Sequence, residues 1–274
     1  MMNRSKLNTQ TQLTYNKMKN IKIIAIDVDG TLLNSKKELT LKVKNTILKA
    51  KRAGIKIVIA TGRPLSGVEK ILTELGLDDQ EDQYVVCFGG GVVETTAGDV
   101  LFEKKLTYDN YLDLETISLK LGLHFHASAP DRIYTADRDI GDYTLYEANL
   151  VNLGISYRTP AEMKDIPIIK CMYVDRQDLL DQKIADHRPF AHLDDEITFT
   201  KTAPFYYEAN PKGVSKGNAL KFLCHKLNLS SENLMAIGDE ENDLSMIKFA
   251  GIGVAMGNAV PAVKEAAQRV TSDC

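Results

Sequence analysis

Short apolar runs rich in β-branched residues alternate with amphipathic stretches at both ends of the chain. Apolar runs of this length, bounded by turn residues, are typical of strands buried on both faces of a parallel sheet. Stretches that repeat apolar residues every three or four positions are typical of helices. The N-terminal part therefore predicts strands at 21–26, 55–60 and 84–88, separated by helices at 40–53 and 64–75.

The same alternation returns near the C-terminus, where we expect strands at 205–209, 234–237 and 252–256 and a helix at 215–228. Strands that alternate with helices in this way indicate a doubly wound parallel sheet. We therefore predict a Rossmann-like α/β core made of both ends of the chain, 21–88 and 207–274.

The middle of the chain, 89–206, has a different pattern. A hairpin is expected at 92–103, and the other predicted elements are helices near 108–121, 139–152 and 177–186 and strands near 123–127, 132–136, 168–174 and 196–201. Consecutive strands without intervening helices favour an antiparallel sheet with helices on one face. We predict that 89–206 is an inserted α/β domain and that 1–20 is a disordered leader.

Composition excludes several classes of protein. The net charge of −3 gives no general attraction to nucleic acid or to an anionic membrane. No apolar run is long enough to cross a bilayer, and 1–20 lacks the apolar segment of a secretory signal. The four cysteines show no C-x-x-C spacing, and three of them lie in apolar runs, which indicates reduced core residues and a cytoplasmic protein.

Residues capable of chemistry stand where predicted strands end or helices begin. They are Asp27, Asp29, Thr61, Lys216, Asp239 and Asp243. Each has an ordinary structural explanation, such as a turn, a helix cap, a surface lysine or an acidic first helical turn. The carboxyl ends of parallel strands, however, lie along one edge of a sheet, so we expect these side chains to converge there.

Such a set of side chains fits phosphoryl transfer. Carboxylate oxygens without histidine or cysteine are the ligands that Mg²⁺ prefers. A hydroxyl, a lysine and the N–H groups of glycine turns suit phosphate oxygens. One carboxylate next to the cation can attack phosphorus, and a second one two residues away can act as general acid and base.

Four motifs carry a resemblance to a known family: D-V-D-G-T at 27–31, A-T-G-R-P at 60–64, G-V-S-K-G at 213–217 and G-D-E-E-N-D at 238–243. In this order they resemble the haloacid dehalogenase superfamily of phosphatases, and within it the Cof-type subgroup and its YidA-like sugar phosphatases. The segments H-F-H-A at 124–127 and Y-T-A-D-R-D-I at 134–140 resemble the cap of those enzymes. The resemblance extends from residue 21 to the end of the chain.

The resemblance implies roles for the acidic residues. Asp27 would be the nucleophile and a Mg²⁺ ligand, and Asp29 would be the general acid and base, with its backbone carbonyl on the metal. Asp239 would bind Mg²⁺ directly, while Asp243 would mainly hold the metal ligands in position. The enzyme would be a phosphoric monoester hydrolase that forms an aspartyl-phosphate.

The resemblance also implies how substrate is held. Thr61 and the Gly62 amide would bind the phosphoryl group, Lys216 would neutralise its charge, and Asn242 would contact phosphate or substrate. The inserted domain would be a C2-type α/β cap that closes over a small phosphorylated molecule.

Specificity must come from the cap, because the core motifs handle only phosphate and metal. His124 and His126 are expected on one face of a strand, since side chains alternate along it. We select His126 and Arg138 as candidates for contacts with sugar hydroxyls, although each is equally well explained as a satisfied surface or core residue.

Two departures from the family pattern and two alternative functions stay open. The chain has Gly89-Gly90-Gly91 where the family commonly has Asn-Gly, and it ends at Cys274, where relatives usually continue into a last helix. The alternatives are a phosphomutase of the same superfamily and a non-catalytic phospho-acceptor module. The natural substrate, the oligomeric state and the pathway are not given by the sequence.

Overall fold

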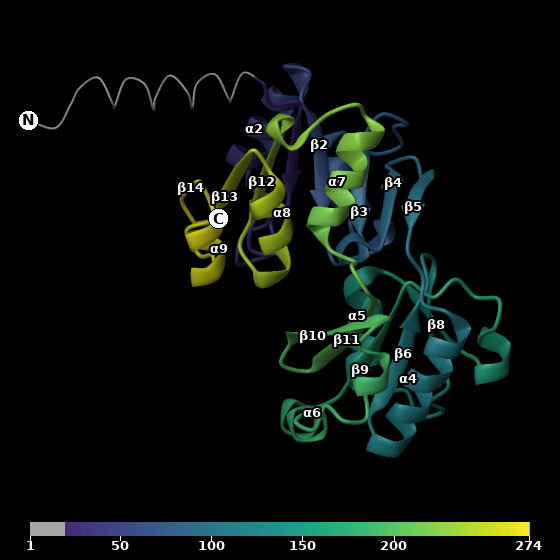
Figure 1. Ribbon diagram of the computed structural model, residues 1–274. Coiled ribbons are helices and arrows are strands. Elements are labelled where there is room, and N and C mark those ends of the chain that lie inside the picture. The colour runs from purple at the N-terminus through teal and green to yellow at the C-terminus, as the bar shows by residue number, and fades with distance from the viewer. Residues whose placement is uncertain (1–19, 274) are drawn as a thin grey trace, which may run out of the picture.

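The computed structural model describes residues 20–273 and contains two β-sheets, each with its own helices (Figure 1). The predicted leader lies outside the described residues, apart from its last position. Both ends of the chain build the larger, eight-stranded sheet, and the middle builds a six-stranded sheet. The predicted α/β class with a parallel core sheet and an inserted second unit is therefore confirmed.

The core sheet is doubly wound. Its strands are, in spatial order, β14 (Arg269–Val270), β13 (Ile252–Ala255), β12 (Leu234–Gly238), β1 (Ile23–Ile26), β2 (Lys56–Ala60), β3 (Tyr84–Cys87), β4 (Val92–Thr95) and β5 (Val100–Glu103). The strands from β14 to β3 are parallel, and β4 and β5 are added antiparallel. Its helices are α2 (Leu41–Arg52), α3 (Glu69–Leu75), α7 (Lys216–Lys226), α8 (Leu244–Phe249) and α9 (Pro261–Ala266).

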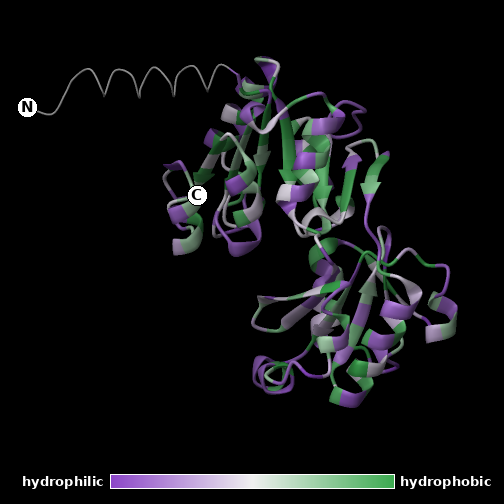
Figure 2. Cartoon of the chain, in the orientation of Figure 1, coloured by the Kyte–Doolittle hydropathy of each residue, from purple (hydrophilic) through white to green (hydrophobic). Residues whose placement is uncertain are grey.

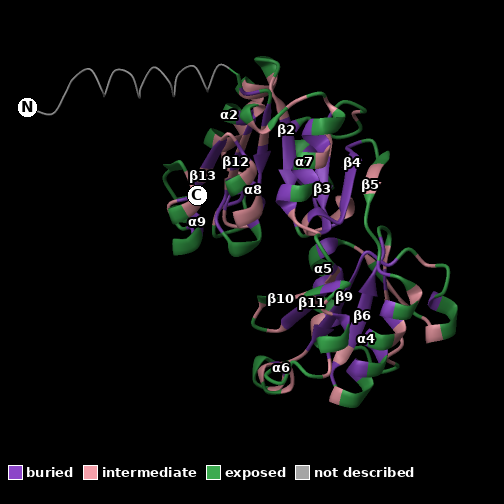
Figure 3. Cartoon of the chain, in the orientation of Figure 1, coloured by how far each residue is buried: buried purple, intermediate pink, exposed green. Residues whose placement is uncertain are grey.

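Alternating side chains of the central strands fill two separate hydrophobic cores, one on each face of this sheet. Ala25 and Val58 belong to the core under α7, α8 and α9, whereas Ile57 and Ile59 belong to the core under α2 and α3. The central strands are accordingly apolar and buried along most of their length (Figures 2 and 3). Burial on both faces explains why these strands appear in the sequence as nearly continuous apolar runs.

The smaller sheet is mostly antiparallel, and only β7 and β8 are parallel neighbours. Its strands are, in spatial order, β10 (Ile197–Ala203), β11 (Tyr206–Pro211), β9 (Lys170–Val174), β6 (His124–Ser128), β7 (Arg132–Thr135) and β8 (Gly154–Tyr157). Its helices are α4 (Tyr108–Leu121), α5 (Asp142–Val151) and α6 (Gln177–Ile184). We call this sheet and its helices the cap.

The prediction that the cap helices lie on one face of its sheet is wrong. Phe125 and Tyr173 pack in one core with α4 and α6. Met172 and Val174, which alternate with these residues along the strands, pack with Tyr143 of α5. α5 therefore lies on the opposite face, and its C-terminal end touches the core where Ser66 Oγ donates to the Val151 carbonyl at 2.9 Å.

The predicted boundaries at 89 and 206 need correction. The hairpin of β4 and β5 extends the core sheet, because β4 pairs antiparallel with β3, as in the partnership of Val86 with Val93. β11, which we expected in the core, pairs instead with β9 and β10 in the cap. Sheet membership places the two crossings between core and cap after Glu103 and after Pro211. The sequence-based boundaries were wrong because a single strand carries no local sign of which sheet it joins.

Within the described residues, no helix combines the length and the apolar character that crossing a membrane requires.

Candidate active site

The turn after β1 brings two strand ends together. β1 pairs with β12, so Asp27, which follows the first strand, lies beside Asp239, which follows the second. Gly30 allows this approach: it has a φ of +85°, and a Cβ there would lie 2.3 Å from Asp239 Oδ2. Any side chain at position 30 would therefore displace Asp239.

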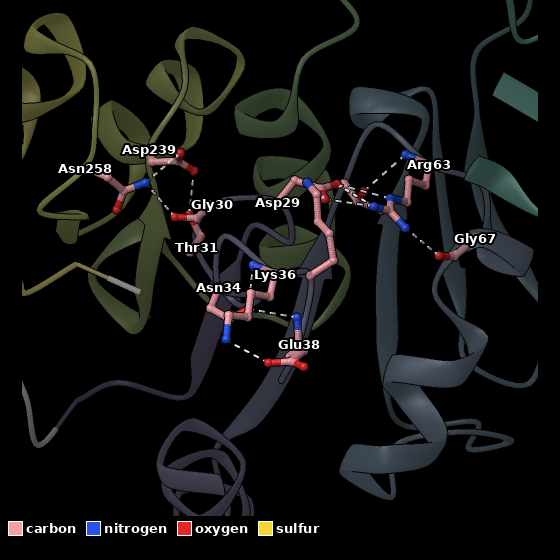
Figure 4. Close-up of polar contacts among 12 residues, drawn as sticks. Asp29, Gly30, Thr31, Asn34, Lys36, Glu38, Arg63, Gly67, Asp239 and Asn258 are labelled. Carbon is pink, nitrogen blue, oxygen red and sulfur yellow. Dashed lines mark hydrogen bonds and ion pairs between the residues drawn. The ribbon is translucent and has the colours of Figure 1, made fainter. Parts of the chain in front are cut away.

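Three buried carboxylates form the centre of the site. One oxygen from each of Asp27, Asp239 and Asp243 lies within 4.8 Å of the others. Asp239 is fixed by Thr31 Oγ1, which donates to it at 2.7 Å, and by Asn258 Nδ2 at 3.1 Å (Figure 4). Asn258 Nδ2 also donates to the Gly30 carbonyl at 2.9 Å and so holds the glycine turn in place.

Lys216 connects the carboxylates. It is the first residue of α7, and the preceding Ser215 caps the helix by accepting from the Asn218 N–H. Its Nζ lies 2.6 Å from Asp27 Oδ1 and 2.6 Å from Asp243 Oδ1, and the residue is only 1% exposed. The lysine predicted as a candidate is therefore an internal cation between two acidic residues.

Asp243 has a second task. Its Oδ2 accepts from the backbone N–H groups of Asp239 and Glu240, at 2.9 and 3.1 Å. The same carboxylate thus fixes both Lys216 and the loop that carries Asp239. Whether Asp243 also contributes to a bound metal stays a prediction.

The charges of this cluster do not balance without a cation. Burial raises the pKa of Asp27 to about 7, even though Lys216 lowers it. Burial also raises the pKa of Asp239. Burial alone would lower the pKa of Lys216, but Asp27 and Asp243 raise it, so the lysine stays charged. Three carboxylates that share one lysine and expose only oxygen atoms fit a hard divalent cation.

Asp29 is held differently, and its side chain is not one of the clustered carboxylates. Arg63 donates to both of its oxygens, with Nη2 2.8 Å from Oδ1 and Nε 3.1 Å from Oδ2 (Figure 4). Lys37 Nζ lies 2.7 Å from Oδ1. Burial would raise the pKa of Asp29, but Lys37 and Arg63 lower it overall. The carboxylate is therefore ionised and turned toward Arg63 in this conformation.

Most residues predicted to hold phosphate border one cavity of about 590 Å³ between core and cap, but Lys216, buried behind Asp27, is not among the residues that line it. Asp27, Asp29, Thr61, Gly62 and Asn242 all line it. Thr61 Oγ1 accepts from the Arg63 N–H at 3.1 Å, and this bond shapes the turn after β2. The structure thus places the nucleophile candidate, the acid/base candidate and most of the phosphate-binding candidates around one space.

The two cap residues selected from the sequence do not reach this space. Neither His126 nor Arg138 is among the residues that line the cavity, and Arg138 is exposed in the loop before α5. His126 is 0% exposed and its Nδ1 lies 3.2 Å from Thr144 Oγ1 of α5. Burial lowers its pKa to about 3, so it is neutral. Helix α5, which we expected on the same face of the cap sheet as the other helices, covers His126. In this conformation the structure supports neither His126 nor Arg138 as a contact with substrate.

Other cap residues line the cavity instead, and the sequence reasoning missed them. They are Tyr146, Glu147, Leu150, Val151, Lys170, Thr200, Thr202, Ala203, Phe205, Tyr206, Glu208 and Asn210. A signal was present: Tyr206, Glu208 and Asn210 alternate along one strand and so share a face. Because that strand was assigned to the core, its polar face was not considered as part of the cap.

The glycine run after β3 also borders the cavity. Gly89 lines it, has a φ of +64°, and a Cβ there would meet no atom within 4 Å. Gly90, by contrast, has no room for a side chain, since its Cβ would lie 2.2 Å from the Ser215 carbonyl oxygen. The space left open at Gly89 belongs to this cavity.

Comparison with known proteins agrees with this geometry. The family model of haloacid dehalogenase-like hydrolases matches residues 24–273. A Streptococcus pyogenes protein named as a phosphatase is 45% identical over 252 residues, which cover 92% of this chain and 93% of that protein. A 5-amino-6-(5-phospho-D-ribitylamino)uracil phosphatase of Bacillus subtilis is 29% identical over 92% of this chain and 90% of its own.

Solved structures show the same architecture. The crystal structure of a haloacid dehalogenase-like hydrolase from Bacteroides thetaiotaomicron has a TM-score of 0.82 and 31% identity to this chain. The match covers 92% of this chain and 94% of that one, so it includes both core and cap. The chain therefore belongs to the family of haloacid dehalogenase-like hydrolases, and it is a phosphatase that acts on phosphoric monoesters.

Proposed function

We propose that this phosphatase uses Mg²⁺ and an aspartyl-phosphate intermediate to hydrolyse phosphate esters of sugars or related small metabolites. One observation carries the proposal: Asp27 is buried beside Lys216, Asp239 and Asp243, and it shares a cavity with Asp29. This arrangement supplies a nucleophile, a cation site and a proton donor around one point.

The chemistry assigns one task to each side chain. An oxygen of Asp27 attacks phosphorus while Thr61 and the Gly62 amide hold the phosphoryl oxygens and Lys216 offsets their charge. Asp29 gives a proton to the departing alcohol, so for this step it has to leave Arg63 and Lys37 and carry that proton. It then removes a proton from the water that hydrolyses the aspartyl-phosphate.

Mg²⁺ would be held by Asp27 and Asp239, with the Asp29 backbone carbonyl as a further expected ligand. When bound, it supplies the positive charge that lets an anionic nucleophile and an anionic phosphate approach each other.

The size and lining of the cavity support this substrate class. A volume of about 590 Å³ is in the usual range for small-molecule sites. The wall on the cap side carries hydroxyl, amide, amine and carboxylate groups, which suit sugar or polyol hydroxyls. A relative named for a phosphoribityl substrate supports a polyol chain.

The proposal is tested by measuring phosphate release from glucose 6-phosphate and from 4-nitrophenyl phosphate. We expect EDTA to stop release, Mg²⁺ to restore it and Zn²⁺ to substitute poorly, because the site offers no soft ligand. Asp239→Ala should sharply raise the Mg²⁺ concentration needed. Full activity in EDTA would contradict the metal site.

The same assay separates the alternatives. A phosphomutase would convert glucose 6-phosphate to an isomer without releasing phosphate, and a phospho-acceptor module would stop after one phosphorylation of Asp27. The mixed sheet of the cap argues against a mutase, because mutases of this superfamily usually carry a helical cap.

Mg²⁺ binding is expected to weaken as the pH falls. Burial raises the pKa of Asp27 to about 7, so a proton competes with the cation below that pH. The apparent dissociation constant should rise by about tenfold for each pH unit below the pKa. Calorimetric titration with Mg²⁺ at several pH values checks this, and a constant affinity between pH 5 and pH 8 would show that Asp27 is not a ligand.

We infer that the protein works in a reducing compartment, the cytoplasm. Cys87, Cys171 and Cys224 are buried and unpaired, and each sits in a hydrophobic core as a small apolar residue.

A further inference from the structure

The cap contributes a polar surface to the substrate cavity, which we call the cap wall: Glu147, Lys170, Tyr206, Glu208 and Asn210. Glu147 comes from α5, Lys170 from β9 and the other three from one face of β11. The cap wall faces the same space as Asp27 and Thr61, so it lies where the group attached to the phosphate must go.

Tyr206 carries an unused hydrogen-bonding group. The residue is 6% exposed, and its hydroxyl has no hydrogen-bond partner among the described residues. Burial, and then the nearby carboxylate of Glu147, raise the pKa of Tyr206, so the hydroxyl keeps its proton. A buried hydroxyl without a partner is unfavourable in the free protein, and a ligand hydroxyl that accepts from it removes that penalty.

Lys170 and Glu208 form a fixed pair next to Tyr206. Lys170 Nζ lies 3.0 Å from Glu208 Oε1, and Lys170 is 4% exposed. Glu208 also accepts from Thr202 Oγ1 at 3.1 Å and from Asn210 Nδ2 at 3.2 Å, so three of its roughly four acceptor sites are occupied within the cap. A lysine ammonium has three donors, so two remain to bind further acceptors at the cavity wall.

The charged side chains that line the cavity restrict which charged groups a substrate can carry in addition to its phosphate. Its acidic lining residues are Asp27, Asp29, Glu147, Glu208, Glu240 and Glu241, and its basic ones are Arg63 and Lys170. Arg63 is already paired with Asp29, and Lys170 with Glu208. A second negative charge on the substrate would therefore be repelled by the excess of carboxylates around the cavity, Glu147 among them, whereas a hydroxyl or an amine would not.

We propose that the cap wall binds the leaving group through Tyr206 and Lys170 and selects a hydroxyl-rich chain that carries no second negative charge. The preferred substrates are thus monophosphates of neutral or amine-bearing sugars and polyols, in preference to sugar acids and bisphosphates. This inference rests on the proposed phosphatase function and adds the specificity of the site.

Tyr206→Phe gives a clean first test, because it removes one oxygen that bonds to no described residue. For glucose 6-phosphate kcat/KM should fall by about five- to tenfold, while 4-nitrophenyl phosphate, which has no sugar hydroxyls, should be hydrolysed as before. The thermal midpoint should stay unchanged or rise. Tyr157→Phe, on the exposed edge of the same sheet, is the matched control and should change neither substrate.

Two outcomes of that experiment would overturn the role of Tyr206. One is unchanged kcat/KM for glucose 6-phosphate in Tyr206→Phe, and the other is an equal fall for the sugar and the aryl phosphate. A third result would also contradict a cap wall that binds hydroxyls: the wild type hydrolyses 4-nitrophenyl phosphate but not glucose 6-phosphate.

The charge preference is tested with three substrates that share one carbon chain: glucose 6-phosphate, glucosamine 6-phosphate and 6-phosphogluconate. We expect the carboxylated substrate to have a kcat/KM lower by about tenfold or more than the other two. Glu147→Gln should raise kcat/KM for 6-phosphogluconate and so reduce its difference from the other two substrates. Glu74→Gln, which changes an exposed residue of α3 outside the cavity, is the control and should leave that difference unchanged.

These measurements distinguish the two proposals. If 4-nitrophenyl phosphate is not hydrolysed in the presence of Mg²⁺, the proposed function itself fails. If it is hydrolysed but the three sugar phosphates have equal kcat/KM, the phosphatase function stands and the selectivity of the cap wall is refuted.

Discussion

Replacing Asp27 with asparagine is expected to abolish phosphate release and leave the fold intact. Asparagine has the shape of aspartate but no negative oxygen that can attack phosphorus. Because phosphate binding by Thr61, Lys216 and the cation does not lead to hydrolysis without the attacking oxygen, the loss should reach about 10⁴-fold or more in kcat. Phosphate release from 4-nitrophenyl phosphate measures this loss without any contribution from the cap wall.

Stability measurements show whether the loss is chemical or structural. Burial raises the pKa of Asp27 from its ordinary value of 3.8 to about 7, so the folded protein without metal loses stability as the pH rises through this range. Asparagine removes that penalty, and in EDTA at pH 8 the thermal midpoint should be unchanged or higher. Mg²⁺ should raise the midpoint less than in the wild type. Wild-type activity in Asp27→Asn would refute the mechanism.

The core of this fold could be predicted because its signals are local. β1, β2 and β12 are buried on both faces, so each appears in the sequence as an apolar run with turn residues after it. The ends of parallel strands share one edge, so the convergence of Asp27, Thr61 and Asp239 followed from strand order alone. The helix caps were equally local: Thr40 caps α2, and Gly76 ends α3 with a left-handed backbone.

The cap could not be predicted to the same extent, because strand pairing depends on partners distant in sequence. β11 precedes the G-V-S-K-G motif, so proximity in sequence suggested the core, yet it pairs with β9 through Tyr207 and Tyr173. β8 was missed because Gly154 and Ser156 interrupt any apolar run. The placement of α5 decided which polar residues reach the cavity, and no local pattern indicates which face of a sheet a helix will cover.

The site repeats this contrast. The candidates for metal and phosphate binding come mostly from turns after core strands, and local sequence patterns indicate them. Its candidates for substrate specificity come from a sheet whose strand order was not known, and His126 was selected because it shares a face with His124 on a predicted cap strand. The predicted strand is present as β6, but Thr144 of α5 covers His126, while Lys170 of β9 lines the cavity.

Lys216→Met is expected to have the second largest effect, and it acts on both activity and stability. Lys216 Nζ lies 2.6 Å from both Asp27 and Asp243, and the side chain is fully buried. Without it, two carboxylates stay buried with no cationic partner, and breaking a buried ion pair in this way costs about 3–5 kcal/mol. Denaturant unfolding in EDTA should show this loss, and saturating Mg²⁺ should recover part of it, because the proposed cation site includes Asp27, one of the two carboxylates.

Activity should fall by about 10²–10³-fold in kcat, the size expected when one donor that stabilises transition-state charge is removed. The fall should be equal for glucose 6-phosphate and 4-nitrophenyl phosphate, because Lys216 faces Asp27 and not the cap wall. Lys221→Met, an exposed lysine on the same helix α7, is the matched control and should change neither property. If Lys216→Met slowed only the sugar phosphate, the lysine would be recognising the leaving group, and the division of labour between core and cap would be wrong. If kcat instead falls equally for both substrates and stays low after Mg²⁺ has restored stability, Lys216 acts in the phosphoryl-transfer step that all substrates share.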